Sequence, residues 1–441
     1  MVSTMARRFG LPALLLWLVF APPAQAQQSN IRLRCPEDVN GDGKVTYGSG
    51  DVDAAPTGNF PGPEDTDFNH NGIFEVDADL PGVVCEHITA GDGNVTMADG
   101  KFQYTFGFNR LPLQPEPGFD PSDPNDVMDR GRLAANFPGP TLVADEDDQV
   151  FLTLTNVGMT MRPDLFDPHS VHWHGFRNAA AIFDGVPDSS IAVSPGASLT
   201  YYYSPKDPGT YMWHCHVEAT EHMQMGMLAN LYVRPRQNRL APATFPNGFV
   251  HQAGNKYVYN DGDGSTRYDV EYPIQIGSFD PDFHDASFGV QPLPFAGMRD
   301  RYFMLNGRGY PDTVNPAELS TLDPTGREQF SQKVTSLIAA NPGQRILLRI
   351  SNLNVTMFNT LATIGIPMRV VGLDAQLLRD DAGNDMSYLT NSITIGGGQS
   401  ADVILDATNA GTYFLYTTNL HHLSNDRENI GGQMTEIRIA N

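Results

Sequence analysis

Cysteine, basic residues and long apolar runs are all scarce in this chain of 441 residues. The three cysteines, Cys35, Cys85 and Cys215, allow one disulfide at most. Only 28 lysines and arginines stand against 51 aspartates and glutamates, so the net charge is −23. So acidic a protein repels nucleic acid and anionic membranes and attracts cations. After residue 26 no stretch approaches the roughly 18 uninterrupted apolar residues of a membrane-spanning helix.

The first 26 residues have the pattern of a removable export signal. Arg7 and Arg8 precede an apolar run from Leu11 to Phe20, and residues 24–26 form a small-x-small cleavage site. The paired arginines partly match the signal that exports a folded, metal-loaded protein. Their removal would change the net charge from −23 to −25. We therefore expect a mature protein that is periplasmic or secreted.

Turn residues and short β-rich segments dominate the rest of the sequence. The chain has 42 glycines and 33 prolines, few amphipathic runs of helix length, and alternating segments such as 102–106 and 149–156. This combination predicts an all-β fold of sandwich type. A mature chain of about 415 residues is longer than one ordinary domain.

A repeated pattern within the sequence indicates how the chain divides into domains. Gly196 lies thirteen residues before the triplet Gly209-Thr-Tyr211, and Gly398 lies thirteen residues before Gly411-Thr-Tyr413. This spacing predicts tandem copies of one β-sandwich module. The expected boundaries are a signal peptide at 1–26, an acidic module at 27–100, and the two sandwiches at 101–236 and 237–441.

The acidic module contains two segments, 38–43 and 67–72, that begin like calcium-binding loops. Oxygen ligands at alternate positions can wrap a hard cation such as calcium. The twelfth loop position is Ser49 in one segment and Ala78 in the other, where a bidentate glutamate is usual. Two solvated acidic turns therefore remain the alternative. The expected calcium ligands are Asp38, Asn40, Asp42, Asp67, Asn69 and Asn71.

The strongest chemical signal is a cysteine with histidine on both sides, at residues 214–216. A thiolate, two imidazoles and a weak thioether form a blue-copper electron-transfer site. The four ligands expected for this copper are His169, Cys215, His222 and Met227. Met223 and Met225 are weaker alternatives for the axial thioether. With Cys215 used as a metal ligand, Cys35 and Cys85 are left to form a disulfide, as an exported protein permits.

Four further histidines form two His-x-His pairs. Side chains alternate faces along a strand, so each pair shares one face and Cys215 points the opposite way from its neighbours. The sequence therefore predicts a second set of copper ligands beside the first. These ligands are His172, His174, His214 and His216.

Several of these segments resemble motifs of the multicopper oxidase family. They are residues 136–141 (NFPGPT), 172–175 (HWHG), 184–187 (DGVP), 209–211 (GTY) and 214–216 (HCH). The resemblance implies cupredoxin-like Greek-key sandwiches, with a type 1 copper in the first and no copper in the second. It also implies that His172 binds a type 2 copper, that the other three histidines bind a type 3 pair, and that Asp184 assists proton delivery to dioxygen.

The resemblance implies an oxidase that takes single electrons from a metal ion or a phenol and reduces O2 to water at a trinuclear copper cluster. In the family this cluster takes eight histidines from two domains, and the first module offers four. We therefore expect a homo-oligomer that shares the copper cluster. The alternatives are an electron-transfer or copper-binding protein with an incomplete cluster, or an enzyme like copper nitrite reductase, against which His216 counts.

Overall fold

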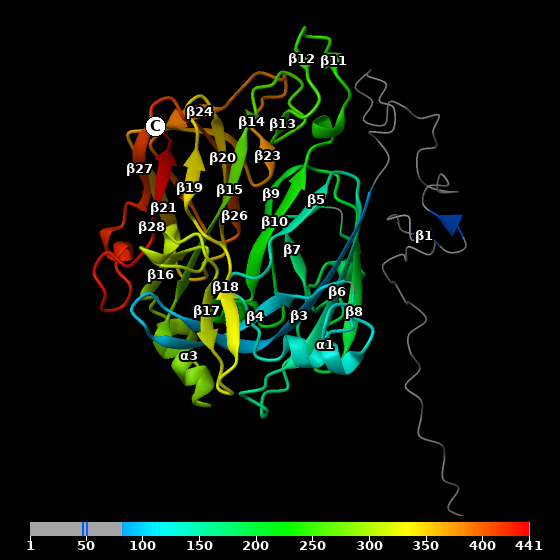
Figure 1. The fold of residues 1–441 in the computed structure, drawn as a ribbon, viewed down its shortest axis with the longest axis vertical. Helices are drawn as coiled ribbons and strands as arrows, with labels where there is room; N and C mark the ends of the chain where they lie inside the picture. The colour runs from blue at the N-terminus through cyan, green and yellow to red at the C-terminus, as the bar shows by residue number, and fades with distance from the viewer. Residues whose placement is uncertain (1–45, 48–49, 52–81, 114, 178, 441) are drawn as a thin grey trace, which may run out of the picture. The chain divides into compact units, whose positions relative to one another are not determined.

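The computed structural model describes residues 46–47, 50–51, 82–113, 115–177 and 179–440 (Figure 1). The predicted signal peptide, the six calcium ligands and Cys35 lie outside these residues. The Cys35–Cys85 disulfide and the calcium loops therefore stay predictions. Among the described residues, no helix combines the length and the apolar character needed to cross a membrane.

The first module is a sandwich of two four-stranded sheets. The order in one sheet is β4-β3-β6-β8, and in the other it is β5-β10-β9-β7. The strands are β3 (Val83–Thr96), β4 (Phe102–Arg110), β5 (Leu142–Asp145), β6 (Gln149–Gly158), β7 (His172–His174), β8 (Ser198–Tyr203), β9 (Gly209–His214) and β10 (Leu228–Arg234). Their inward faces form one apolar core that includes Trp173, Trp213 and Cys215.

The second module repeats this plan. Its sheets have the orders β16-β15-β20-β26-β22-β23, with β24 on β22, and β19-β28-β27-β21-β25. The strands are β15 (Val270–Phe279), β16 (Tyr302–Leu305), β19 (Ile338–Ala340), β20 (Arg345–Asn352), β21 (Asn359–Ile364), β22 (Met368–Leu373), β23 (Gln376–Leu377), β24 (Tyr388–Thr390), β25 (Ser392–Ile395), β26 (Gln399–Asp406), β27 (Gly411–Thr417) and β28 (Met434–Ile439). Aliphatic side chains fill its core.

The two modules match strand for strand, which confirms the predicted tandem sandwiches. Strands β4-β3-β6-β8 correspond to β16-β15-β20-β26, and strands β5-β10-β9-β7 correspond to β19-β28-β27-β21. The parallel pairs also correspond, β3 with β6 to β15 with β20, and β5 with β10 to β19 with β28. Gly209 and Gly411, at the starts of β9 and β27, share a positive φ of 142° and 149°.

The first sheet begins before residue 101, where the sequence placed the start of the module. Strand β3 pairs with β4 from Ile88, opposite Arg110, to Thr96, opposite Phe102. Its interior contains Gly91, Asp92 and Gly93. Glycine and aspartate are poor strand formers in isolation, so the alternation typical of a strand is broken there. Tertiary pairing on both edges overrides that local preference.

The remaining elements are short and lie in connections. The helices are α1 (Pro124–Gly131), α2 (Ala219–Met225), α3 (Pro281–Phe288), η1 (Ala181–Phe183), η2 (Arg236–Arg239), η3 (Phe295–Gly297), η4 (Asp312–Val314) and η5 (Leu420–Leu423). The short strands are β1 (Thr46–Tyr47), β2 (Gly50–Asp51), β11 (Ala243–Thr244), β12 (Val250–His251), β13 (Lys256–Tyr257), β14 (Arg267–Tyr268), β17 (Leu319–Leu322) and β18 (Glu328–Gln332). Helices α1 and α3 each begin with an aspartate cap followed by proline, a favoured helix start.

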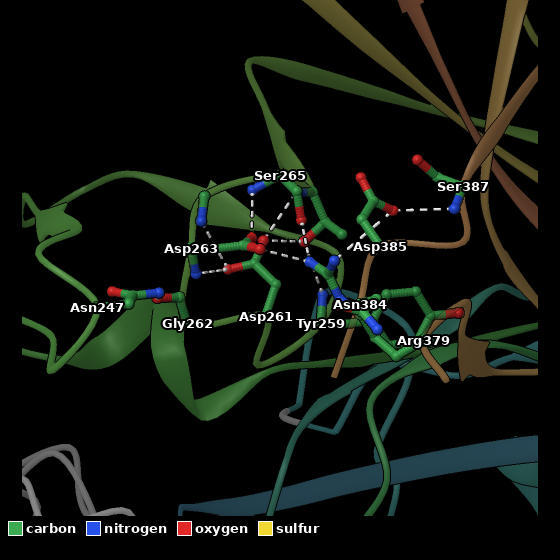
Figure 2. A network of polar contacts seen from close by, with 12 residues as sticks. Asn247, Tyr259, Asp261, Gly262, Asp263, Ser265, Arg379, Asn384, Asp385 and Ser387 are labelled. Atoms are coloured by element: carbon green, nitrogen blue, oxygen red, sulfur yellow. Dashed lines mark hydrogen bonds and ion pairs between the residues drawn. The ribbon is translucent and has the colours of Figure 1, made fainter. Parts of the chain in front are cut away.

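A polar network holds the inserted hairpins between the modules to the second sandwich. The Asp261 carboxylate accepts hydrogen bonds from the backbone of Gly264 and Thr266 and from the Gln237 amide. Figure 2 shows Arg379, from the connection after β23, beside this loop. Its guanidinium donates to Asp263 at 2.6 Å and to Ser265 at 2.7 Å. Asp261 and Asp263 are therefore committed to structural contacts.

Buried polar contacts also join the two sandwiches. Arg349 is fully buried, lies 2.8 Å from Glu271, and donates to the Thr210 hydroxyl of β9. Asp402 accepts a hydrogen bond from the same hydroxyl at 2.5 Å. Burial raises the pKa of Glu271, but Arg349 and Arg234 outweigh it and lower that pKa to about 2. Side chains of the second module are therefore hydrogen-bonded to β9, the strand that ends at His214.

Candidate metal centre

The loop after β9 brings the predicted blue-copper ligands together. Strand β9 ends at His214, and the chain then enters helix α2, which carries His222. Gly226 ends this helix with φ of 117°, where a side chain would meet the Phe106 carbonyl oxygen at 2.8 Å. The chain turns back so that the Cys215 amide donates to the Met227 carbonyl oxygen at 3.1 Å. A glycine is required at this turn.

One thiol and two imidazoles converge in the core of the first module. The Cys215 Sγ atom lies 3.1 Å from His222 Nδ1 and 3.8 Å from His169 Nδ1. All three side chains are fully buried. The Ser170 amide donates to the same sulfur at 3.4 Å. Their ligand atoms lie within 4.8 Å of one another, and a soft sulfur with two nitrogens is a donor set that suits copper.

The charges around the sulfur favour a thiolate. Burial raises the pKa of Cys215, but His222 and His169 outweigh it and lower that pKa to about 5. Burial lowers the pKa of His222, whereas Cys215 and Asp167 together raise it well above the usual value. His222 Nε2 lies 3.0 Å from the Asp167 carboxylate, which leaves Nδ1 facing the sulfur. A carboxylate behind a histidine is the usual support of a metal ligand.

The axial methionine is less sharply defined. Met227 and Met225 are both fully buried in the core that contains Cys215. Met223 differs, because it lines the cavity formed by the other histidine set. The structure therefore separates Met223 from the two other methionines, and the choice of Met227 over Met225 stays a prediction.

The second histidine set lines a cavity of about 530 Å³. The ligand atoms of His172, His174 and His214 lie within 4.8 Å of one another. His216 lines the same cavity, with its ring centre 4.9 Å from that of His172. The opposite wall comes from the second module, through residues 353–358 and Gly397-Gly398. The four predicted histidines are thus gathered in one place.

Backbone oxygens orient two of these rings. His172 Nδ1 donates to the Asp184 carbonyl oxygen at 2.6 Å, and the Asp184 carboxylate lies 3.4 Å from the same nitrogen. His214 Nδ1 donates to the Cys215 carbonyl oxygen at 2.8 Å. In both rings Nε2 is then the nitrogen left to face the cavity, and His214 Nε2 lies 3.2 Å from His174 Nδ1. Burial lowers the pKa of His172, His174 and His214, so their imidazoles are neutral near pH 7.

Strand β9 ends earlier than the sequence indicated, at His214 instead of residue 216. The predicted opposition of faces still holds. Cys215 joins His169 and His222 on one side, and its two neighbours line the cavity on the other. Only the peptide backbone of residues 214–216 therefore separates the two donor groups.

Two models of the multicopper oxidase family match this chain, at residues 131–238 and 295–436, together more than half of its length. The chain belongs to the multicopper oxidase family. Multicopper oxidase MCE of Talaromyces pinophilus is 33% identical over 123 residues, which are 27% of this chain and 19% of that protein. Laccase-5 of Arabidopsis thaliana is 26% identical over 274 residues, 61% of this chain and 38% of that protein. The chain thus spans less than half the length of these relatives.

A solved structure shares this fold. A blue copper oxidase from Nitrosomonas europaea superposes with a TM-score of 0.56 at 21% identity, covering 81% of this chain and 86% of that one. This similarity confirms the cupredoxin-like architecture and extends across both modules.

The second module of this multicopper oxidase has no counterpart to the ligands of the first. Pairing of β21 with β27 places Ala362 opposite Tyr416 and Ile364 opposite Phe414. Pairing of β7 with β9 places His172 opposite His214 and His174 opposite Met212. The structural equivalents of the histidine run are therefore residues 362–364.

The other described histidines serve the structure or face solvent. His251 is buried and bonds to the Leu240 carbonyl oxygen, and His284 is buried between two carbonyl oxygens. His422 stacks on Phe303 with ring centres 4.0 Å apart, and His87 bonds to Thr155. His421 is exposed. None of these five belongs to either group of converging ligands found in the described residues.

Sequence reasoning missed two features of this centre. Asp167, which supports His222, has no motif of its own, although its position two residues before His169 was a signal. The wall formed by residues 353–358 could not be found, because it carries no histidine or cysteine and lies far from the motifs in sequence.

Gly398 approaches the second histidine set closely enough to test it. Its φ is +87°, and a Cβ atom there would lie 2.7 Å from His174 Nε2. We expect Gly398→Ala to displace His174 and to weaken copper binding in the cavity by about 10- to 100-fold, as for loss of a residue that supports a metal ligand. Copper titration of the purified protein, with the type 1 colour as internal reference, measures this loss.

Gly343→Ala is the matched control for that experiment. Gly343 has nearly the same φ, +88°, and nothing lies within 4 Å of the added Cβ. Both substitutions carry the backbone cost of a non-glycine residue in the left-handed region, about 1–2 kcal/mol. Equal copper affinity in the two variants would show that Gly398 does not position His174.

Proposed function

We propose that this protein is an exported copper oxidase that takes electrons singly from a small reducing substrate and passes them to dioxygen. The observation that carries the proposal is the placement of Cys215 between two donor groups. Its sulfur meets His169 and His222, and the adjacent residues His214 and His216 enter the four-histidine cavity. Copper bound in these two places would supply one-electron transfer and oxygen reduction.

The residues present fit this role. His169, Cys215 and His222, with Met227 as the axial ligand, would hold a type 1 copper in a dry core. His172 would hold a type 2 copper, and His174, His214 and His216 would belong to a type 3 pair. The short covalent path through residues 214–216 would carry electrons from the thiolate to the cavity.

Asp184 is suited to move protons at the cavity. Its carboxylate is partly exposed, with 30% of the side chain accessible, and lies 3.4 Å from His172 Nδ1. It therefore stands between solvent and a cavity-lining imidazole. We propose that it relays the protons that oxygen reduction consumes.

Substrate electrons would enter at the opposite side of Cys215. His222 is fully buried, and its outer nitrogen contacts Asp167. Glu218 and Glu221 precede His222. Glu218 is exposed, whereas Glu221 is buried, and burial raises its pKa to about 7. The Glu218 carboxylate suits a cationic donor such as Cu(I), Fe(II) or Mn(II), and a phenol remains the other substrate class.

Association would complete the cluster. The cavity gathers four histidines, and the described part of the second module contributes residues 353–358 and two glycines without any further imidazole. Phe358, at the wall of this cavity, is 73% exposed. We propose a homo-oligomer in which neighbouring subunits place their histidine cavities together, most simply as an isologous dimer.

The oxidase proposal is tested by the number of substrate electrons consumed per molecule of O2. The purified, copper-loaded protein should consume oxygen with a panel of metal ions and phenols, with four electrons taken per O2 and no accumulated peroxide. Blue colour without oxygen uptake would instead identify an electron carrier. Nitrite reduction without oxygen uptake would identify the alternative enzyme.

Met227→Leu tests the axial ligand. Both side chains are similar in volume, and such exchanges in a core usually cost less than about 1.5 kcal/mol. We expect the variant to remain blue with a raised reduction potential, because the axial thioether tunes the copper without anchoring it. Redox titration of the blue band measures the shift. Met225→Leu is the matched buried control, and a potential that moves only in this control would reassign the axial ligand.

A further inference from the structure

Helix α2, which carries His222, is held from outside by the second module. Gln224 lies between His222 and Met227 and is 1% exposed. Its side-chain amide donates to Asp300 Oδ1 at 2.7 Å, and its carbonyl oxygen lies 2.9 Å from His284 Nε2. Both partners belong to the copper-free sandwich. The loop that supplies two type 1 ligands therefore takes its position partly from the other module.

Asp300 also holds the wall of the histidine cavity. Its second oxygen, Oδ2, accepts hydrogen bonds from Ser278 at 2.5 Å and from the Thr356 hydroxyl. Asn354 donates to the Ser278 hydroxyl, and its side-chain oxygen accepts from the Thr356 amide at 2.8 Å. Asn354 and Thr356 both line the cavity with the four histidines. One oxygen of a buried carboxylate thus bonds to the helix that carries His222, and the other bonds to residues that hold the wall of the histidine cavity.

His284 also packs against the loop that carries His222. It is fully buried in α3, and its two ring nitrogens face the carbonyl oxygens of Tyr104, at 2.5 Å, and Gln224. Burial lowers its pKa to about 4, so the ring is neutral near pH 7 and its single N–H can bond to only one of the two carbonyl oxygens beside it. Tyr104 lies in β4 of the first module, so the ring bridges two elements of that module from the second. The carbonyl oxygen and side-chain amide of Gln224 are therefore both in contact with the second module.

We propose that Asp300 is a positioning residue that couples the type 1 site to the histidine cavity, so that a change at the cavity wall is felt by the type 1 copper. This inference rests on the proposed function for the identity of the metals. It assigns a role to the second module, which carries neither group of converging ligands. Polar side-chain networks in a dry interior are stiff, so displacement of one member moves the others.

Thr356→Val is the decisive variant. Thr356 lies in the second module and touches Asp300 and Asn354, so a local effect would be confined to the cavity wall. The coupling instead predicts looser packing of α2. In the metal-free protein, hydrogen exchange of the amides of Gly226 and Met227, which bond to the His222 carbonyl oxygen, should accelerate by about tenfold. In the copper-loaded protein the potential and the electron paramagnetic resonance spectrum of the type 1 copper should shift.

Asp300→Asn should produce both effects more strongly, because an amide cannot accept all three hydrogen bonds. Asp323→Asn is the matched control. Asp323 is also buried, at 7% exposure, and accepts hydrogen bonds from Thr325, Arg327 and Gln329 within the β17–β18 turn. It should lower stability comparably while leaving the exchange of residues 226 and 227 unchanged.

The outcomes separate the two proposals. If Thr356→Val leaves α2 exchange and the type 1 spectrum at wild-type values, the coupling is overturned, whatever Asp300→Asn does. If Asp323→Asn accelerates the same amides equally, the effect is general destabilisation and the coupling is again refuted. If exchange responds as expected but the protein shows no oxidase activity, the coupling stands and the proposed function fails.

Discussion

Cys215→Ser is expected to abolish the blue colour and the oxidase activity while the fold persists. The Cys215 sulfur lies against both His169 and His222, at 3.8 and 3.1 Å. A serine hydroxyl cannot replace a soft thiolate as a copper ligand. Losing a residue that merely supports a metal ligand typically costs about 10- to 100-fold in affinity or activity, so loss of the ligand itself should exceed that range. Absorption spectroscopy and oxygen uptake measure the two effects.

The structural cost of this substitution should be small. The serine hydroxyl can accept the Ser170 amide that now donates to the sulfur, and burial of the new polar group should cost about 1–3 kcal/mol. Thr417→Ser provides a control, because Thr417 is the buried equivalent of Cys215 in the second module. A blue, active Cys215→Ser protein would overturn the assignment of the type 1 site.

Dilution is expected to release the cavity coppers and the oxidase activity together, with the type 1 copper retained. The reason is mass action, because a cluster completed by a second subunit stabilises the assembly and the assembly stabilises the cluster. The proposed type 1 ligands are all buried within the first module of one subunit and need no partner subunit. Copper analysis and light scattering on the same samples across a concentration series would follow both quantities.

Phe358→Asp should produce the same dissociation at a fixed concentration. Phe358 is 73% exposed at the cavity wall, so a charge there leaves the subunit core intact. Loss of an aromatic anchor at an interface typically weakens association by about tenfold or more. Leu322→Asp, on an exposed residue of β17 that does not line the cavity, is the matched control. A monomer that retains cavity copper and reduces oxygen to water would refute the shared cluster.

Much of the centre was predictable because its ligands are chemically unusual and local in sequence. The types of donor atom in the runs around His172 and Cys215 indicate copper. The alternation of side chains along a strand predicts that the histidines flanking Cys215 point away from its sulfur. The β-sandwich class and the internal repeat also followed from turn spacing. The start of the first module did not, since Gly91 to Gly93 break the alternation of β3, which depends on its neighbours for pairing.

The sequence by itself predicted copper as the metal, the two histidine-containing groups that the structure brings together, and the tandem all-β plan, because each depends on residue type and short spacing. Only the tertiary structure decided what surrounds them. The Asp167 carboxylate lies against His222, and residues 353–358 form a wall of the cavity. Asp300 bonds both to Gln224 on helix α2 and to Thr356 in that wall. These contacts join segments far apart in the sequence, such as Gln224 and Asp300, which are 76 residues apart, through the packing of one sandwich on the other. Short-range spacing carries no record of such packing, whereas buried polar groups at an interface must find partners across it.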